Sequence, residues 1–222
     1  MQITRWRLAA VLALLLCVGL PAAPPAAAMV ILGGGTAIVV DGVNDCTLTT
    51  IGRDRAGDVV GFTAAKCGGP GATVAIAGSN ATVGTVVAAN SELQYAVIKF
   101  DVPDIIAVSD YAGFAINGIG PDPEWRRSTC KFGPVSGQYC NAITIVGPGP
   151  RLSMAGPIQA GEFGAPVTAD GLLVGMAYGG YALPATKYGY VGTITQLTPF
   201  SAILADVNAS GGPGSGFVPV GS

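Results

Sequence analysis

The sequence predicts an all-β fold built from short strands joined by tight turns. Glycine accounts for 34 of the 222 residues and charged residues for only 11% of them, a composition that suits close connections between short strands. No long helical periodicity follows the first 28 residues. Runs rich in β-branched residues recur instead about every ten residues, at residues 36–40, 47–51, 59–64, 73–77, 82–87, 95–100, 142–146, 172–177 and 190–194. This spacing is typical of a β-barrel or a β-sandwich.

The connections between these runs carry turn and linker signals. Residues 54–57, D-R-A-G, predict a hairpin turn between two strands. Residues 117–123 contain two prolines and two glycines, which interrupt a hydrogen-bonded ladder, and therefore predict a linker. We accordingly divide the folded chain into an N-terminal unit at residues 29–120 and a C-terminal unit at residues 121–208.

Residues 198–208 form the one predicted helix, with Pro199 near its start, where a missing N–H costs little. Its apolar residues recur at the spacing of one helical face: Phe200, Ile203, Leu204 and Val207. The glycine-rich residues 209–222 predict a flexible tail, and the three glycines at 33–35 predict a flexible lead-in.

The first 28 residues have the pattern of a secretory signal peptide. Arg5 and Arg7 give a positive start, residues 8–20 are apolar, and residues 26–28 are small alanines suited to cleavage. The apolar run is short for a membrane span, and a retained anchor is the alternative. We therefore expect a secreted or extracytoplasmic protein that meets a membrane only through this segment before cleavage.

Cleavage would leave about 190 residues, enough for one large all-β domain or two small barrels that share a core. Without Arg5 and Arg7, nine basic residues face thirteen acidic ones, so the net charge changes from −2 to −4. This acidic balance argues against nucleic acid or an anionic membrane as an electrostatic partner.

Four cysteines remain after cleavage: Cys46, Cys67, Cys130 and Cys140. An even count in an exported chain predicts two disulfides, although spacing alone leaves all three connectivities open. Metal binding is the competing use, but the chain has no Cys-x-x-Cys pair and no histidine to complete a tetrahedral site. We therefore expect no metal, apart from a weak calcium site in an aspartate-rich turn. A P-loop or dinucleotide fingerprint is also absent, so no cofactor is expected.

Several stretches of the chain match, in order, the motifs of one enzyme family. They are T-A-A-K-C at residues 63–67, Q-Y-A-V-I at 94–98, the cysteine-closed loop at 130–140, G-E-F-G-A-P-V at 161–167 and G-L-L-V-G-M at 171–176. In this order they resemble the chymotrypsin-like serine proteases, in their actinobacterial, streptogrisin-like secreted form. The resemblance spans about residues 36–200 and implies two six-stranded antiparallel β-barrels with a short C-terminal helix. It also implies the disulfides Cys46–Cys67 and Cys130–Cys140.

The chain departs from this family at all three catalytic positions. Lys66 stands where the resemblance places the general-base histidine, Gln94 where it places the orienting aspartate, and Phe163 where it places the nucleophilic serine. Acyl transfer by this mechanism needs an activated hydroxyl, and phenylalanine has no nucleophilic atom. No shifted histidine can replace the base, because the chain contains none. These substitutions predict a secreted pseudoprotease with a binding or structural role.

Two alternatives stay open. The first is a peptidase or other hydrolase of the same fold that uses non-standard residues, for example Lys66 as the base, although it would need a hydroxyl partner. The second is a purely structural extracytoplasmic protein with no function in a cleft. The resemblance suggests a cleft that accepts an extended peptide or a protein partner by strand addition.

The loop at 161–167 carries two further expectations from the resemblance. The backbone N–H groups of Gly161 and Phe163 would form the oxyanion hole, and we expect the Phe163 ring to fill the space above them. Glu162 corresponds to a buried, ion-paired acid, and Arg151 is a candidate partner.

Overall fold

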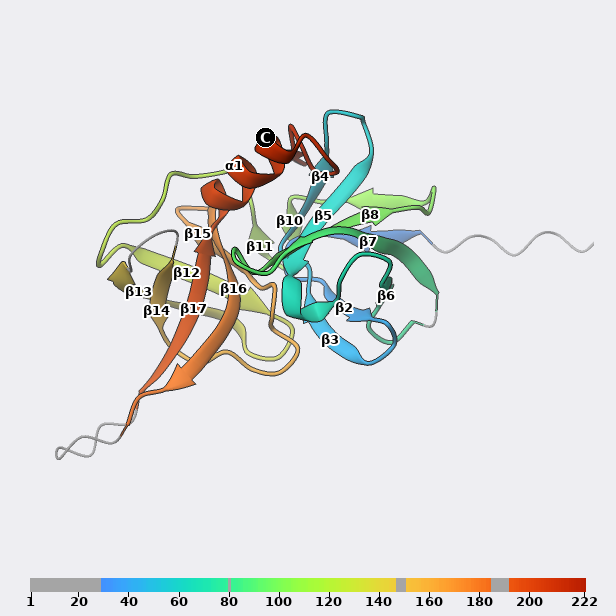
Figure 1. Ribbon diagram of the computed structural model, residues 1–222. Coiled ribbons are helices and arrows are strands. Elements are labelled where there is room, and N and C mark those ends of the chain that lie inside the picture. Colours follow the sequence, from blue (N-terminus) through green and yellow to red (C-terminus); the bar gives the residue numbers. More distant parts are fainter. Residues whose placement is uncertain (1–28, 80, 147–150, 185–191) are drawn as a thin grey trace, which may run out of the picture.

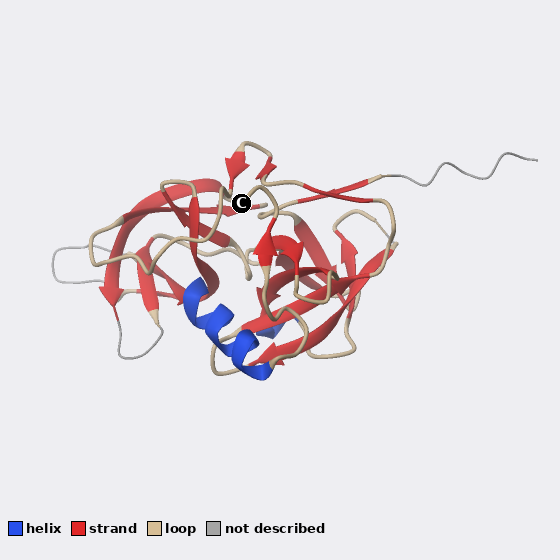
Figure 2. Ribbon diagram, turned by 90° about the horizontal axis from the view of Figure 1, so that it is seen from above, coloured by secondary structure: helices blue, strands red, loops and turns tan. Residues whose placement is uncertain are grey.

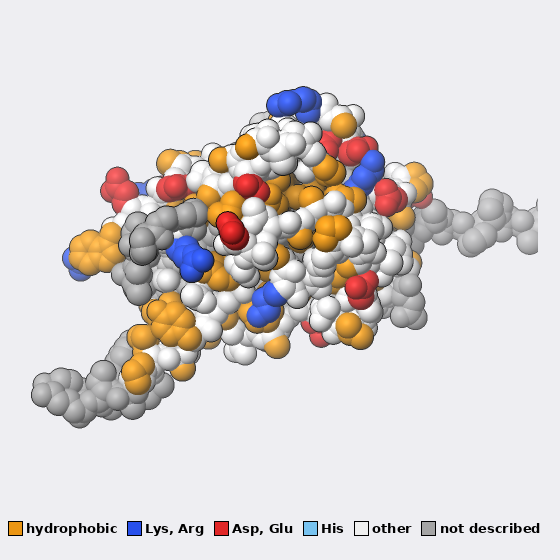
Figure 3. Space-filling model, in the orientation of Figure 1, with side chains coloured by type: hydrophobic (Ala, Val, Ile, Leu, Met, Phe, Trp, Pro, Cys, Tyr) orange, Lys and Arg blue, Asp and Glu red, His pale blue; other side chains and the backbone are white. Residues whose placement is uncertain are grey.

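The computed structural model describes residues 29–222 except 80, 147–150 and 185–191. The predicted signal peptide and part of the strand expected at residues 190–194 lie outside the described residues. Two β-structured halves lie side by side, and helix α1 (Phe200–Ser210) runs along one side of both of them (Figures 1 and 2). Charged side chains are scattered over the face seen in Figure 3.

The N-terminal half is one open eight-stranded sheet with the order β18-β4-β5-β8-β7-β6-β2-β3. All of its neighbouring strands are antiparallel. Its strands are β2 (Ala37–Val40), β3 (Asn44–Thr47), β4 (Thr50–Arg53), β5 (Val59–Ala64), β6 (Thr73–Ile76), β7 (Thr82–Asn90), β8 (Tyr95–Phe100) and β18 (Val218–Pro219). Shorter elements accompany this sheet: η1 (Ala65–Cys67), β1 (Val30–Leu32), which pairs in parallel with β9 (Ile105–Ala107), and the hairpin of β10 (Asp110–Tyr111) and β11 (Phe114–Ala115).

The C-terminal half is a closed six-stranded barrel with the order β12-β13-β14-β17-β16-β15. Its strands are β12 (Ser128–Gly133), β13 (Gly137–Val146), β14 (Leu152–Ala155), β15 (Pro166–Ala169), β16 (Leu172–Ala182) and β17 (Thr193–Pro199). The predicted fold class is therefore confirmed: the chain is mainly β, with a closed barrel, a second half-barrel sheet and one short C-terminal helix. The N-terminal half differs from the expected six-stranded barrel in that its strands form an eight-stranded sheet. The run predicted at residues 47–51 is split between β3 and β4.

Both predicted disulfides are present. Cys46 is bonded to Cys67, and Cys130 to Cys140. The second bond joins directly paired residues of the β12–β13 hairpin. The connectivity implied by the family resemblance is thus confirmed.

The prediction of a flexible tail at residues 209–222 is wrong. The tail returns to the N-terminal sheet, where β18 pairs with β4 through Val218 opposite Arg53. Phe217 is 7% exposed, and its ring centroid lies 5.0 Å from that of Phe62 and 6.3 Å from that of Phe200. Burial of this aromatic ring and the added ladder offset the entropy lost when a glycine-rich segment becomes ordered.

The glycines at 33–35 are also ordered, contrary to the prediction of a flexible lead-in. All three are buried, and the N–H of Gly35 donates to the carbonyl oxygen of Leu48 (2.7 Å). A Cβ atom on Gly34 would lie 2.4 Å from Cδ1 of Ile116. These glycines therefore serve close packing, not flexibility.

Candidate functional site

The loop at residues 161–167 belongs to the C-terminal half but is held by the N-terminal half. The hydroxyl of Thr47 donates to the carbonyl oxygen of Gly161 (2.7 Å), and the hydroxyl of Thr49 donates to that of Gly164 (2.6 Å). The N–H of Thr47 donates to the carbonyl oxygen of Phe163 (2.8 Å). The loop therefore lies at the junction of the two halves, with its backbone oxygens turned toward the segment between β3 and β4.

Two glycines allow the loop to take this course. Gly161 has φ 90° and Gly164 has φ 93°, values in the left-handed region that side chains disfavour. A Cβ atom on Gly164 would also lie 2.2 Å from the carbonyl oxygen of Thr47. Glycine at 164 is thus required by both the backbone conformation and the close approach of the N-terminal half.

The side chain of Glu162, within this loop, is fully buried and is paired with Lys131 of β12, which is also fully buried. Its carboxylate accepts hydrogen bonds from the Lys131 ammonium, from the N–H and hydroxyl of Ser136 (2.7 and 2.5 Å), and from the N–H of Gln159 (3.0 Å). Burial alone would raise the pKa of Glu162, but these hydrogen bonds together lower it below the ordinary value. Glu162 is therefore ionised near neutral pH, and its buried hydrogen bonds hold the loop at 161–167 against the rest of the C-terminal half.

The buried, paired state of Glu162 agrees with expectation, but its predicted partner does not. Arg151 is exposed, and Lys131 makes the ion pair instead. A sequence signal for Lys131 existed: in β12 the residues Thr129, Lys131 and Gly133 alternate with more exposed neighbours, so that a lysine falls on the inward face. A lysine at a position that points into a barrel requires a buried acid as its partner.

Lys66 and Phe163 are in direct contact. The Nζ atom of Lys66 lies 3.2 Å from the centroid of the Phe163 ring, which is the geometry of a cation–π interaction. Lys66 lies in η1, directly before the disulfide-bonded Cys67, and the preceding Ala65 donates its N–H to the carbonyl oxygen of Gln94 (2.9 Å). Partial burial lowers the pKa of Lys66 from its ordinary value.

Gln94 lies beside this pair, in the turn directly before β8. Its backbone is left-handed (φ 60°), and its side-chain amide donates to the carbonyl oxygen of Ser91. Lys66, Gln94 and Phe163 line one open pocket of about 500 Å³, together with Ile158, Tyr178, Gly179, Gly180 and Gln196. The structure thus brings together the three residues singled out from the sequence.

This pocket offers little reactive chemistry. The Phe163 ring has no nucleophilic atom, and no carboxylate is among the described residues that line the pocket. Its one hydroxyl belongs to Tyr178, whose pKa is raised by burial, so the phenol stays protonated near neutral pH. The other polar side chains that line the pocket are the amides of Gln94 and Gln196 and the ammonium of Lys66.

The backbone donors expected for an oxyanion hole are Gly161 and Phe163. Within the described part of the chain, no backbone or side-chain acceptor takes a hydrogen bond from either N–H. The half-buried Phe163 ring carries the Lys66 ammonium on its face.

The described residues contain no group of three histidine, cysteine or acidic side chains that could hold a metal ion. Within the same residues, no helix is long and apolar enough to span a membrane.

Comparisons by sequence find no relative: no family model matches the chain, and no curated protein is significantly similar to it. Solved structures do match. The Nocardiopsis protease NAPase aligns with a TM-score of 0.64 at 19% identity, covering 80% of this chain and 97% of that one. Cellulomonas bogoriensis chymotrypsin aligns at 0.63 and 22% identity, with 86% and 100% covered. Thermobifida fusca protease A aligns at 0.64 and 18% identity, with 80% and 96% covered. At these identities the similarity establishes the fold.

Proposed function

We propose that this protein, which has the fold of the chymotrypsin-like serine proteases, is a secreted and catalytically inactive homologue of them. In this proposal it serves as a binding or structural protein outside the cytoplasm. The contact between the Lys66 ammonium and the Phe163 ring, at 3.2 Å, carries the proposal. The family resemblance assigns these two positions to the general base and the nucleophile, so a cation on an aromatic ring stands in place of a reacting pair.

The absence of suitable groups supports inactivity. The chain has no histidine, and a lysine base would still need a hydroxyl nucleophile within reach. Thr63, three residues before Lys66, is fully buried and donates its hydroxyl to the carbonyl oxygen of Thr47 (2.8 Å). That hydroxyl is occupied by a hydrogen bond within the N-terminal half and is not exposed to a substrate.

The free edge of β16 supports a binding role. Up to Met176 this strand pairs with β15 on one side, and up to Ala182 it pairs with β17 on the other. Among the described strands none pairs with the remaining edge of residues 178–182, which includes Gly179 and Gly180 beside the pocket. An extended peptide could add there as a further strand, since glycines allow close backbone approach.

The site assignment and the inactivity are tested together by active-site labelling. The purified secreted protein is treated with a fluorophosphonate probe, next to two variants: Lys66→His/Gln94→Asp/Phe163→Ser and, as the matched control, Lys66→His/Gln94→Asp with Phe163 kept. We expect labelling of the triple variant only, because it alone has a hydroxyl beside a base. Labelling of the unmodified protein would refute inactivity. A folded triple variant that takes up no probe would refute the assignment of these three positions.

A further inference from the structure

A second pocket lies on the linker between the two halves, away from the residues discussed above. Up to Gly120 the linker runs along β16: the N–H of Gly120 donates to the carbonyl oxygen of Leu173 (2.9 Å), and the N–H of Leu173 donates to that of Gly118 (2.9 Å). The chain attaches again at Arg126, whose N–H donates to the carbonyl oxygen of Ile143 of β13 (2.9 Å). Between these two attachments the linker leaves the barrel wall.

The sequence explains why the linker leaves the wall. Pro121 and Pro123 have no N–H to donate, so the ladder that Gly120 makes with β16 cannot continue past them. A turn follows, closed by the N–H of Arg127, which donates to the carbonyl oxygen of Glu124 (3.0 Å). The space enclosed under the linker has a volume of about 460 Å³, within the range of small-molecule sites. We call this space the linker pocket.

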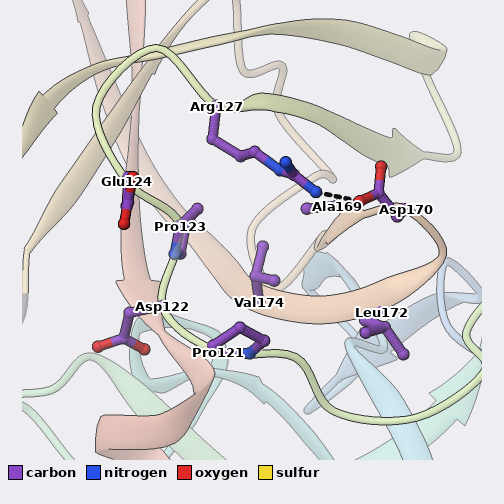
Figure 4. Close-up of a pocket in the computed structure, with 9 residues that line it drawn as sticks. All are labelled: Pro121, Asp122, Pro123, Glu124, Arg127, Ala169, Asp170, Leu172 and Val174. Carbon is purple, nitrogen blue, oxygen red and sulfur yellow. Dashed lines mark hydrogen bonds and ion pairs between the residues drawn. The ribbon is translucent and has the colours of Figure 1, made fainter.

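The linker pocket has an apolar floor and a charged rim (Figure 4). The floor consists of buried or half-buried apolar side chains of the barrel, Ala169, Leu172 and Val174, and the buried Pro123 of the linker faces the same space. The rim consists of exposed charged side chains: Asp122, Glu124, Arg127 and Asp170. In Figure 4 Asp122 and Glu124 lie on one side of the pocket, and the Arg127–Asp170 ion pair lies on the other.

The charges of the rim do not balance. Arg127 is already paired with Asp170, and among the described residues no cation pairs with the carboxylates of Asp122 and Glu124. From the residues that the structure describes, Asp122 accepts one side-chain hydrogen bond, from the neutral hydroxyl of Ser201. Within the described part of the chain, Glu124 has no side-chain hydrogen bond or ion pair. The rim therefore has a net charge of −2 above an apolar floor.

We propose that the linker pocket binds a small organic cation: a molecule with an ammonium or guanidinium group and an apolar body. The apolar body would cover the floor at Leu172 and Val174, while the cationic group would meet the carboxylates of Asp122 and Glu124. A neutral apolar molecule would gain the first contact alone, and an inorganic cation the second alone. The inference is independent of the proposed inactivity, because the linker pocket shares no residue with the pocket at Phe163.

The test is a titration of the ¹⁵N-labelled protein with 2-phenylethylammonium, followed by amide chemical shifts. Its neutral counterpart, 2-phenylethanol, has the same apolar body without the charge. We expect saturable shifts confined to residues 118–127 and 169–174, and about tenfold weaker binding of the alcohol. The variant Asp122→Asn/Glu124→Gln is expected to weaken binding of the ammonium ion about tenfold as well.

The matched control is Glu92→Gln/Asp104→Asn, which removes the same two charges from exposed positions outside the linker pocket. This variant should bind the ammonium ion as the unmodified protein does. Saturable binding elsewhere, no saturable binding, or equal affinity for the ammonium ion and the alcohol would each overturn the proposal. All the changed side chains are exposed, and the far-ultraviolet circular dichroism of each variant verifies that it is folded.

Discussion

Replacing Lys131 with methionine tests the role of the buried ion pair beneath the loop at 161–167. The substitution keeps an apolar stem of similar length and removes only the ammonium group that neutralises Glu162. Both side chains are fully buried, so the carboxylate would be left without a counter-ion. Breaking a buried pair in this way costs about 3–5 kcal/mol. Against a typical total stability of about 5–15 kcal/mol, that loss is large.

The stability of Lys131→Met should also change with pH, in a direction that follows from the pKa of Glu162. In the unmodified protein the pKa of Glu162 is lowered below 4.5, so its contribution to stability is complete above that pH and is lost as the pH falls through the folded-state pKa. In Lys131→Met, burial is opposed only by the hydrogen bonds from Ser136 and Gln159, and we expect the pKa to rise above 4.5. The variant should then recover stability as the pH is lowered from near 7 to near 5.

The assay is guanidinium unfolding near pH 7 and near pH 5 with the disulfides intact. The control is Lys131→Met/Glu162→Gln, which keeps a hydrogen-bond acceptor for Ser136 but has no buried charge. We expect the single variant to be less stable than the double variant near pH 7 and the gap to narrow near pH 5. A loss below about 1 kcal/mol for Lys131→Met, or a gap that does not change with pH, would refute the reasoning.

Two further predictions concern packing. Phe217→Ala should lower the free energy of unfolding by about 3–5 kcal/mol, because it removes a buried ring from the aromatic cluster. The neighbouring Val218→Ala, at a side chain that is 56% exposed, should change it by less than about 0.5 kcal/mol. Equal effects of the two substitutions in chemical denaturation would contradict an ordered tail. Gly133→Ala should destabilise by about 1–3 kcal/mol, because its Cβ atom would lie 2.7 Å from Oε1 of Glu162, while Gly69→Ala meets no atom within 4 Å. Here the informative measurement is the difference in midpoint between the two alanine variants, and a difference near zero would count against tight packing around Glu162.

The strand pattern was predictable because it rests on local signals. Turn residues and β-branched runs located β2, β5, β6, β7 and β8 to within a few residues, and the apolar face at 198–208 located α1 to within two. The run at 47–51 is divided because the segment between β3 and β4 turns toward the loop at 161–167. That contact joins residues more than a hundred positions apart, and no local pattern records it.

The tail could not be predicted for the same reason, and charge alone did not identify the partner of Glu162. A glycine-rich composition indicates a large loss of conformational entropy on ordering, but it does not show the contacts that offset this loss. In the tail these contacts are made by Phe217 with Phe62 of β5. Arg151 was a reasonable partner by charge alone. Lys131 is the actual partner because strand alternation points it into the barrel, where Glu162 already lies.

The residues of the site were predicted more completely than the details of the fold, because they were inferred from motifs and not from composition. Lys66, Gln94 and Phe163 come from three separate stretches and line one pocket. The contact of the Lys66 ammonium with the ring was not predicted; a filled cleft was expected from Phe163 alone. Side-chain identity shows which atoms are absent, whereas only the structure shows how the remaining ones are arranged.

The pairing of β18 with β4 has a consequence for the order in which the molecule is assembled. The closed barrel uses only residues 128–199, but the N-terminal sheet needs Val218 and Pro219 as its outermost strand. A chain emerging from a ribosome or a translocation channel can therefore complete its second half before its first. Protease protection of released chains truncated near residue 211 should appear in the barrel and not in the sheet; the reverse pattern would contradict this view. Residues 218 and 219 thus complete the half whose other strands precede the barrel in the chain.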